Sequence, residues 1–333
     1  MNAERFSLPL TEPLATAAGD ITEREGFLVT VNEPTIGVGE ATPLSGWTES
    51  LAACREALAT AEPASVDELP PAARHGVSLA LFDAAARDAE QPLYRHLGRD
   101  DRVETVPVNA TVGDADADTT ASRVEAAAES GFPAVKLKVG VRSLDEDVAR
   151  VRAARDAAPD IELRLDANGA WDRDTAADAV DAVQPLDVAY VEQPLPATDL
   201  AGHAMLRGRG VGVALDEGLY EHGIDAALDA DAADVWILKP MAMGGPDVTL
   251  DAAVLARGAG IDPVVTTTVD GAVARAAAVH VAAAVPDVSP CGLATRDLLA
   301  TDLAPDHAPV RDGRARVPQK DGNIPPPSRV DCA

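Results

Sequence analysis

The stretch AVKLKVG, residues 134–140, decides the fold, because it is a short apolar strand pattern that carries two lysines. The chain has only four lysines among 28 basic residues, and two of the four, Lys136 and Lys138, lie in this stretch. Arginine can replace lysine on a surface, but it cannot act as a proton-transfer base because its pKa stays above about 12. The stretch therefore predicts a strand on which a titratable amine is needed.

Segments of the same kind recur outward from this stretch. Short apolar strands alternate with helical segments such as SRVEAAAES and AADAVDAVQPL. Together with residues 134–139, the expected strands are residues 105–111, 161–167, 188–193, 211–217, 234–240, 262–268 and 290–295. Eight such units predict a parallel sheet closed into an α/β fold, a (β/α)8 or TIM-like barrel. A doubly wound open sheet is the alternative, but no G-x-G-x-x-G follows the first strand.

The first hundred residues follow a different pattern. The expected strands are residues 26–32 and 35–42, joined at Glu33-Pro34, and the expected helices are residues 49–61 and 72–89. Strands followed by helices indicate an α+β unit. The predicted domains are an α+β domain over residues 1–102, the barrel over residues 103–300, and a C-terminal segment over residues 301–333 that returns to the α+β domain and ends in a frayed tail.

The composition excludes several classes of protein. The net charge of −27 is spread along the chain, which argues against nucleic acid as a partner because phosphate would be repelled. Scarce lysine with abundant Asp and Ala is typical of a halophile's solvated surface and predicts loss of the fold at low salt. No run of about 18 apolar residues indicates a membrane span. The three cysteines have no pattern of a disulfide framework or a thiolate metal site, so we expect a cytoplasmic protein.

Charged residues recur at one place in the pattern, the C-terminal end of successive strands. Lys138, Asp166, Glu192, Asp216 and Lys239 are separated by 28, 26, 24 and 23 residues, each about one βα unit. In a barrel these side chains would converge on the face where barrel enzymes keep their active sites. Taken singly, such a carboxylate is more often the N-cap of the next helix, and such a lysine is usually solvated. Five of them in register favour a site.

The residue types in this row point to one kind of chemistry. Three carboxylates without Cys or His form an all-oxygen site of the kind that suits Mg²⁺. The two lysines come from strands on opposite sides of the carboxylates. A divalent ion flanked by two amines is suited to removing a proton next to a carboxylate, and this predicts a small-molecule carboxylate as the substrate.

These motifs resemble those of the enolase superfamily, specifically its muconate-lactonizing-enzyme subgroup, over nearly the whole chain. KLK at 136–138 matches the K-x-K motif, and LKPMAMGG at 238–245 matches the strand with the opposing lysine. LDANGAW (165–171), VEQPL (191–195) and LDEGL (215–219) match the three metal-ligand strands. The resemblance implies a barrel with an α+β capping domain and Mg²⁺ as cofactor, with Mn²⁺ as a substitute.

The resemblance also implies roles for single residues. Lys138 is the expected base that removes the proton α to the substrate carboxylate, and Lys239 is the expected opposing charge, or the second acid/base of a racemase. The expected metal ligands are Asp166, Glu192 and Asp216, whose ion stabilises the enediolate. The expected supporting residues are Lys136, Asn168 and Glu217. Lys136 acts electrostatically, since a neighbouring ammonium depresses the pKa of an amine.

Within the subgroup, residues 39–51, 264–287 and 291–299 look most like the o-succinylbenzoate synthase family. This likeness implies a carbon–oxygen lyase of menaquinone biosynthesis. Its reaction is the syn-dehydration of 2-succinyl-6-hydroxy-2,4-cyclohexadiene-1-carboxylate to o-succinylbenzoate. The expected substrate contacts are Thr267, Thr268 and Gly292, and the expected specificity loops lie near residues 14–25 and 44–50.

Three other functions stay open at this point. An N-acylamino acid racemase uses the same scaffold and the same lysine pair. A dipeptide epimerase is expected to carry D-x-D at the eighth strand, where this chain has GLATRD. A non-catalytic barrel is the third alternative, and the intact lysines and carboxylates argue against it.

Overall fold

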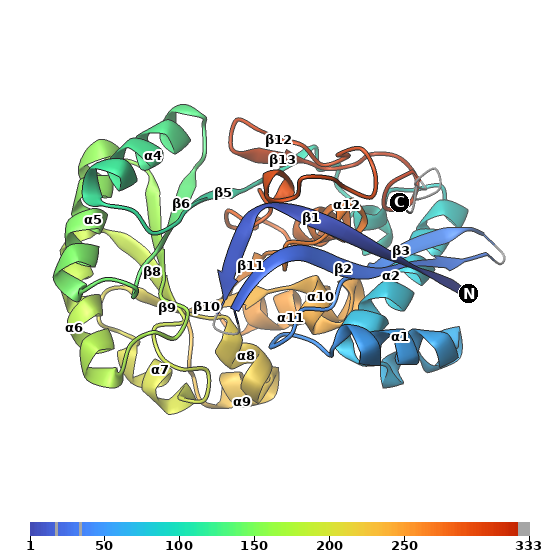
Figure 1. The fold of residues 1–333 in the computed structure, drawn as a ribbon, viewed down its shortest axis with the longest axis horizontal. Coiled ribbons are helices and arrows are strands. Elements are labelled where there is room, and N and C mark those ends of the chain that lie inside the picture. The colour runs from blue at the N-terminus through green and yellow to red at the C-terminus, as the bar shows by residue number, and fades with distance from the viewer. Residues whose placement is uncertain (17–18, 33–34, 326–333) are drawn as a thin grey trace.

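The computed structural model describes residues 1–16, 19–32 and 35–325. Figure 1 shows the barrel on the left and in the centre. The antiparallel sheet of β1 (Asn2–Thr16), β2 (Gly19–Val31) and β3 (Gly37–Ala41) runs from the centre to the right, where helices α1 (Leu51–Thr60) and α2 (Pro71–Asp88) lie. No helix in the described part of the chain is long and apolar enough to cross a membrane. The architecture confirms the predicted barrel with an α+β capping domain.

The barrel is a parallel sheet of seven strands in the order β11-β10-β9-β8-β7-β6-β5. The strands are β5 (Asn109–Val112), β6 (Ala134–Lys138), β7 (Glu162–Asp166), β8 (Val188–Glu192), β9 (Gly212–Leu215), β10 (Val235–Leu238) and β11 (Asp262–Val265). Strands β6 to β11 each lie inside the stretch predicted for them, whereas the predicted stretch 105–111 is divided between β4 (Thr105–Pro107) and β5, which ends one residue beyond it. Their apolar residues pack against the surrounding helices, so that Val135, Leu163 and Val191 belong to one buried cluster.

The predicted eighth strand, residues 290–295, is reduced to two isolated bridges. Cys291 pairs with Val108 beside β5, and Gly292 pairs with Thr266 beside β11. The Cys291 N–H donates to the Pro107 carbonyl at 2.9 Å, and the Gly292 N–H donates to the Val265 carbonyl at 2.9 Å. These bonds join the two edges of the seven-stranded sheet, which closes the ring.

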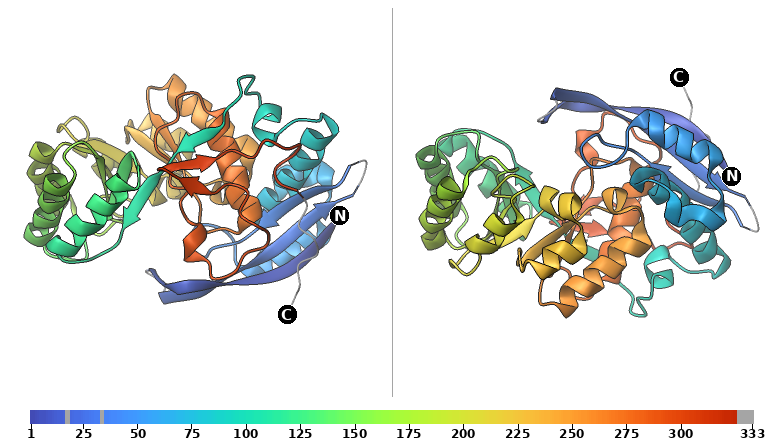
Figure 2. Two further views of the ribbon diagram at one scale, coloured as in Figure 1. Left: turned by 90° about the horizontal axis from the view of Figure 1, so that it is seen from above. Right: turned by 90° about the horizontal axis from the view of Figure 1, so that it is seen from below.

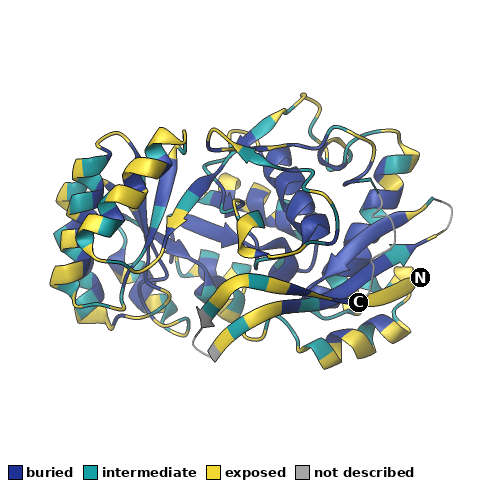
Figure 3. Cartoon of the chain, turned by 45° about the horizontal axis from the view of Figure 1, so that its top comes forward, coloured by how far each residue is buried: buried dark blue, intermediate teal, exposed yellow. Residues whose placement is uncertain are grey.

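Helices cover the outside of the ring. They are α4 (Ala117–Glu129), α5 (Leu144–Ala157), α6 (Arg173–Val183), α7 (Leu200–Leu206), α8 (Glu217–His222), α9 (Ile224–Asp229), α10 (Pro240–Met243), α11 (Pro246–Gly258) and α12 (Ala272–Ala284), with short 3-10 turns η2 (Gln184–Leu186) and η3 (Arg296–Leu298). Figure 3 shows the strands buried and the exposed residues on the outer faces of these helices. Helix α12 differs from the others because all of its residues are buried.

The capping domain is a three-stranded antiparallel sheet backed by helices. Its elements are β1 (Asn2–Thr16), β2 (Gly19–Val31), β3 (Gly37–Ala41), α1 (Leu51–Thr60), η1 (Pro63–Glu68), α2 (Pro71–Asp88) and α3 (Leu93–His96). Helix α2 lies directly on the backbone of β3. A Cβ on Gly39 would sit 2.0 Å from the Gly76 carbonyl, so only glycine permits this approach. Figure 2 shows the sheet lying along the side of the barrel that α12 forms.

The capping domain also departs from the sequence prediction. The two predicted helices agree with α1 and α2 to within two residues, and β2 and β3 occupy the two predicted strands. Strand β1 was not predicted, because Pro9 and Pro13 interrupt it and only Phe6 and Leu8 give it a buried alternation. The prediction of a loop near residues 14–25 is wrong for the part that the structure describes. Residues 14–16 belong to β1, and residues 19–25 belong to β2. The predicted junction at Glu33-Pro34 lies outside the described residues.

The C-terminal segment contacts the barrel first and the capping domain second. Strands β12 (Val310–Arg311) and β13 (Arg314–Arg316) form a small sheet with β4 (Thr105–Pro107). The chain then reaches α2 and α3, where the Gly322 carbonyl accepts from the Leu93 N–H at 2.8 Å and the Asn323 N–H donates to Asp83 Oδ1 at 2.6 Å. Residues 326–333, which include most of the expected frayed tail, lie outside the described residues.

Candidate active site

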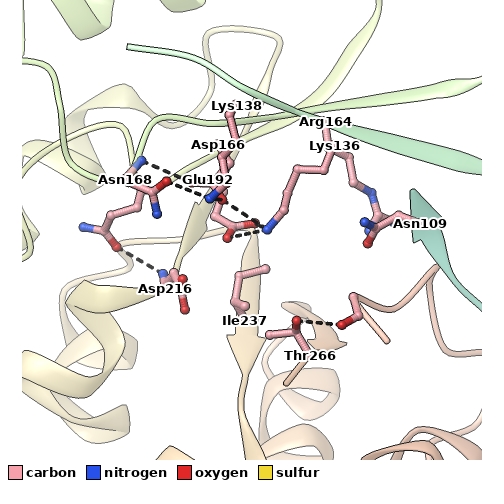
Figure 4. Close-up of polar contacts among 12 residues, drawn as sticks. Asn109, Lys136, Lys138, Arg164, Asp166, Asn168, Glu192, Asp216, Ile237 and Thr266 are labelled. Carbon is pink, nitrogen blue, oxygen red and sulfur yellow. Dashed lines mark hydrogen bonds and ion pairs between the residues drawn. The ribbon is translucent and has the colours of Figure 1, made fainter. Parts of the chain in front are cut away.

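Five strands position the charged residues at one end of the barrel. In the ladders, Lys138 pairs with Asp166, and Asp166 pairs with Glu192, so the three lie at the same level of neighbouring strands. Asp216 directly follows β9, and Lys239 directly follows β10. The structure thus brings together the residues singled out from their spacing, as Figure 4 shows for the carboxylates and the lysines of β6.

Lys136 lies beneath the carboxylates and binds two of them. Its Nζ donates to Glu192 Oε1 at 2.8 Å and Oε2 at 2.9 Å, and lies 3.2 Å from Asp166 Oδ2. Burial alone would lower the pKa of Lys136, but Glu192 and Asp166 outweigh it and raise the pKa well above its usual value. Lys136 is therefore a fixed cation inside the barrel.

Lys138 reaches further toward the open end of the barrel. Its Nζ donates to Asp166 Oδ2 at 2.6 Å and to Asn168 Oδ1 at 2.7 Å. The side chain is 37% exposed, against 15% for Lys136. Burial would raise the pKa of Asp166, but the two ammonium groups of Lys136 and Lys138 hold it well below its usual range. Lys138 is thus the lysine of β6 that an incoming molecule can contact.

Asn168 connects this lysine to Glu217. The Asn168 N–H donates to Asp166 Oδ1 at 3.1 Å, and its Nδ2 donates to Glu217 Oε1 at 3.2 Å. Asn168 has a left-handed backbone with φ 44°, which turns its side chain back toward the strand ends. Both residues, expected as supporting groups, lie within one hydrogen-bonded chain with Lys138.

Lys239 faces the other end of the carboxylate row. Its Nζ lies 2.6 Å from both carboxylate oxygens of Asp216, and only 9% of its side chain is exposed. Asp216 occupies the N-cap position of α8, yet its side chain makes no capping bond. The N-cap interpretation of this residue is therefore wrong, because its carboxylate points to the lysine instead.

Burial makes two carboxylates of the site, Glu192 and Asp216, harder to ionise, whereas Asp166 is held ionised by its two lysines. Burial raises the pKa of Glu192 to about 7, with a further rise from Asp166, although Lys136 opposes it. Burial likewise raises the pKa of Asp216 to about 6, against the effect of Lys239. Buried carboxylates that repel one another in this way favour an added cation.

The donor set fits Mg²⁺ by its chemistry. Asp166, Glu192 and Asp216 supply only oxygen atoms, and Glu217 Oε2 is buried without a hydrogen-bond partner. As they stand, however, no three acidic, His or Cys side chains in the described ranges lie close enough together to hold a metal ion. The reason is that Asp166, Glu192 and Asp216 each turn toward a lysine ammonium.

The residues expected to contact the substrate interact with other residues of the protein. Thr267 Oγ1 lies 3.1 Å from Thr295 Oγ1, and the Thr268 hydroxyl donates to Asp270 Oδ1 at 2.5 Å. Gly292 lies against Thr266, whose Oγ1 would be 2.4 Å from a Cβ at this position. These residues follow β11 or pair with its end, so they lie at the same end of the barrel as the charged row.

Two residues that help to build the site were not singled out in the sequence. Gln193 follows Glu192 directly, and its Oε1 accepts from the N–H groups of Asp216 at 3.1 Å and Gly218 at 2.9 Å, which positions the start of α8. Its place inside the motif VEQPL was the available signal. Trp47 was not singled out, but it lies in the predicted specificity loop near residues 44–50, which was the available signal, and its ring covers Lys239 from the capping domain.

Comparison with known proteins agrees with this geometry. The family described as "Enolase C-terminal domain-like" matches residues 119–323. The o-succinylbenzoate synthase of Thermobifida fusca is 40% identical over 61% of this chain, and the match spans 63% of that protein, less than two thirds of its length. The o-succinylbenzoate synthase of Mycobacterium bovis is 36% identical over 69% of each chain.

A solved structure covers more of the chain at lower identity. The dipeptide epimerase from Enterococcus faecalis, complexed with Mg and the dipeptide L-Leu-L-Tyr, matches with a TM-score of 0.86 and 26% identity. That match covers 96% of this chain and 97% of the epimerase. The fold is therefore shared along the whole length, whereas the higher identity to the synthases is limited to part of it.

Proposed function

The chain belongs to the enolase superfamily, and we propose that it is an o-succinylbenzoate synthase, a Mg²⁺-dependent dehydratase. The identity of 40% to one synthase and 36% to another supports this choice over the more distant epimerase at 26%. The substrate is 2-succinyl-6-hydroxy-2,4-cyclohexadiene-1-carboxylate, and the products are o-succinylbenzoate and water.

The observation that carries the proposal is the difference between the two lysines. Lys138 is 37% exposed at the open end of the barrel, whereas Lys239 is 9% exposed and lies 2.6 Å from both oxygens of Asp216. A syn-dehydration needs one group that first takes a proton and then gives one on the same face. A racemase needs two mobile groups on opposite faces. One accessible lysine and one restrained lysine favour the dehydratase.

The proton path uses Lys138 twice. Neutral Lys138 Nζ takes the proton α to the carboxylate, and the C–H electron pair passes into the ring system. The C–O bond at the hydroxyl-bearing carbon then breaks, and the departing hydroxide takes the proton back from Lys138 as water. The ring becomes aromatic and Lys138 is neutral again, so that atoms and charge balance.

The remaining residues hold charge in place. Asp166, Glu192 and Asp216 would hold Mg²⁺, which supplies positive charge to the substrate carboxylate when bound. Lys136, fixed against Glu192 at 2.8 Å, adds a second positive charge next to Lys138. Lys239 supplies a third on the opposite side. Positive charge around a carboxylate lowers the cost of the negative charge that develops as the α-proton leaves.

A racemase or epimerase acting on acylated amino acids is the second candidate. The observation that favours it is that both lysines are present on opposite sides of the row, on strands separated by β7, β8 and β9. The match to the dipeptide epimerase over 96% of the chain supports the same alternative. A racemase or epimerase would differ from the synthase in one measurable respect, because it would exchange the α-proton of its substrate without loss of water.

The test is a turnover assay with Mg²⁺ in concentrated KCl, which the net charge of −27 makes advisable. The cyclohexadiene carboxylate is supplied and the aromatic product is followed by its absorbance. Lys138→Ala should lose at least about 10²-fold in kcat, because a positioned base contributes that much or more. Lys320→Ala, the same change at an exposed lysine, is the control. A folded, Mg²⁺-loaded wild type that forms no aromatic product would overturn the synthase proposal.

A further inference from the structure

The ring of Trp47 covers the ammonium of Lys239. The Nζ atom lies 3.2 Å from the centroid of the indole, well within the range of a cation–π contact. Trp47 comes from the capping domain, between β3 and α1, whereas Lys239 directly follows β10 of the barrel. A residue of one domain thus covers a proposed functional residue of the other.

Contacts within both domains fix the position of the indole. On the capping side, the Trp47 N–H donates to the Leu44 carbonyl at 2.9 Å, and Thr48 Oγ1 accepts from the Leu44 N–H at 2.9 Å. On the barrel side, the ring packs edge-on against Tyr220, with centroids 5.3 Å apart and planes at 79°. The ring is therefore held between a closed turn and an aromatic side chain.

Tyr220 links this arrangement to the strand that bears the lysine. Its hydroxyl donates to the Ile237 carbonyl at 3.1 Å and accepts from the Lys239 N–H at 2.6 Å. The backbone of Lys239 and the ring of Trp47 are thus positioned by the same tyrosine. Among the described residues, the ammonium at the end of the side chain is left with two partners, Asp216 and the indole face.

We propose that Trp47 is a positioning residue that holds Lys239 as a fixed cation, so that the site favours one-base dehydration over two-base racemisation. The inference rests on the proposed function and deepens it. A divalent cation taken up by Asp216 removes that carboxylate as the partner of Lys239. The indole face is then the contact that keeps the ammonium from reaching across to the α-carbon of the substrate.

The proposal is tested by two substitutions that differ in the aromatic face. Trp47→Leu keeps an apolar side chain but removes the face, and Trp47→Phe keeps a face of smaller size. We expect kcat for dehydration to fall about tenfold in Trp47→Leu, with KM changed less than about twofold. Trp47→Phe should retain kcat to within about threefold of wild type. Equal losses in both variants, or wild-type kcat in Trp47→Leu, would overturn the proposal.

A second measurement separates this inference from the proposed function. L- and D-N-succinylphenylalanine are incubated with each variant in D₂O, and loss of the α-proton signal is followed by NMR. Because the two lysines lie on opposite sides of the carboxylate row, we expect one enantiomer to present its α-proton to Lys138 and the other to Lys239. In Trp47→Leu, the exchange rate of the slower enantiomer should rise relative to that of the faster one. An unchanged ratio of the two exchange rates would contradict the role of Trp47. If wild type exchanges these protons but forms no aromatic product, the synthase proposal fails while the ratio still tests Trp47.

A third readout does not depend on activity. Free energies of unfolding are measured in urea without metal for wild type, Trp47→Leu, Lys239→Met and the double variant. The two substitutions should be non-additive, because each removes the same cation–π contact. Additive effects would show that the indole does not bind the ammonium, which would overturn the proposal whatever the activities are.

Discussion

Lys138 and Arg24 owe their positions to different kinds of contact. Lys138 stands on β6 and is aligned with Asp166 and Glu192 by the hydrogen bonds of adjacent parallel strands. Arg24 stands on β2 of the capping domain and reaches into the barrel, where its Nε donates to the Val269 carbonyl at 3.3 Å. The first arrangement follows from the regular repeat of the barrel, whereas the second depends on how two domains meet.

The strand side of the site comprises Lys136, Lys138, Asp166 and Glu192. These side chains project from consecutive strands, so one repeated distance in sequence places them together. Their interaction is ionic, with lysine and carboxylate atoms between 2.6 and 3.2 Å apart. A change here should alter the chemistry more than the fold.

The cap junction comprises Arg24, Glu40 and Val269. Glu40 on β3 accepts from the N–H groups of Gly271 at 2.7 Å and Ala274 at 2.9 Å, so its carboxylate satisfies the N-terminus of α12. Val269 has φ 61°, which is strained for a β-branched residue. A change here should alter the stability of the domain junction more than the chemistry.

The largest effect is expected on the strand side. Glu192→Gln removes a proposed metal ligand and should lower kcat/KM for dehydration at least about 100-fold, because a metal contributes several kcal/mol to the barrier. Glu125→Gln makes the same change at an exposed position of α4 and should leave the rate unaltered. Activity is measured with the aromatic-product assay at saturating Mg²⁺. A Glu192→Gln enzyme within tenfold of wild type would show that Glu192 is not a ligand.

A smaller effect, on stability, is expected from Glu40. Burial and the nearby Asp270 raise the pKa of Glu40 to about 7, above its ordinary value of 4.5. The folded protein therefore binds this proton more tightly, and the stability it contributes is complete below about pH 4.5 and lost as the pH rises through 7. The contribution of this proton to the free energy of unfolding is at most about 3 kcal/mol.

This pH dependence can be isolated by substitution. Urea unfolding of wild type and Glu40→Gln, both saturated with Mg²⁺, is measured between pH 5 and 8. The wild type should lose more stability than Glu40→Gln as the pH rises, because Gln cannot ionise. Parallel curves for the two proteins would mean that Glu40 titrates normally in the folded protein.

The smallest effect is expected from Arg24→Lys. Arg24 is 3% exposed and also donates to the carbonyls of Thr42 at 2.9 Å and Pro43 at 3.2 Å. Lysine keeps the charge but lacks the planar fork, so at least one of the three carbonyls loses its donor. We expect a loss of about 1–2 kcal/mol in the free energy of unfolding, with kcat nearly unchanged.

The matched control for this change is Arg209→Lys. Arg209 forms an exposed ion pair with Asp181, and its replacement should cost less than about 0.5 kcal/mol. Both variants are compared by urea unfolding at one pH. If Arg24→Lys is no more destabilised than Arg209→Lys, the hydrogen bonds of Arg24 do not hold the junction.

Sequence patterns located most of the barrel, and the exceptions have physical causes. Strands β5 to β11 were found because short segments rich in apolar residues alternate regularly with helical segments. The eighth strand is only two bridges at Cys291 and Gly292, too short for an apolar run to define it. Strand β1 was not predicted, because its prolines interrupt the alternation and many of its side chains are exposed.

The sequence by itself determined the row of charged residues, because a βα repeat of nearly constant length puts one residue of each unit at the same edge of a parallel sheet. It also predicted that lysine is needed at position 138, since arginine cannot serve as a proton-transfer base. Only the tertiary structure decided that Lys138 is open while Lys239 is covered by Trp47. The contact between Trp47 and Lys239 joins two domains across 192 positions of sequence, and no local period connects them.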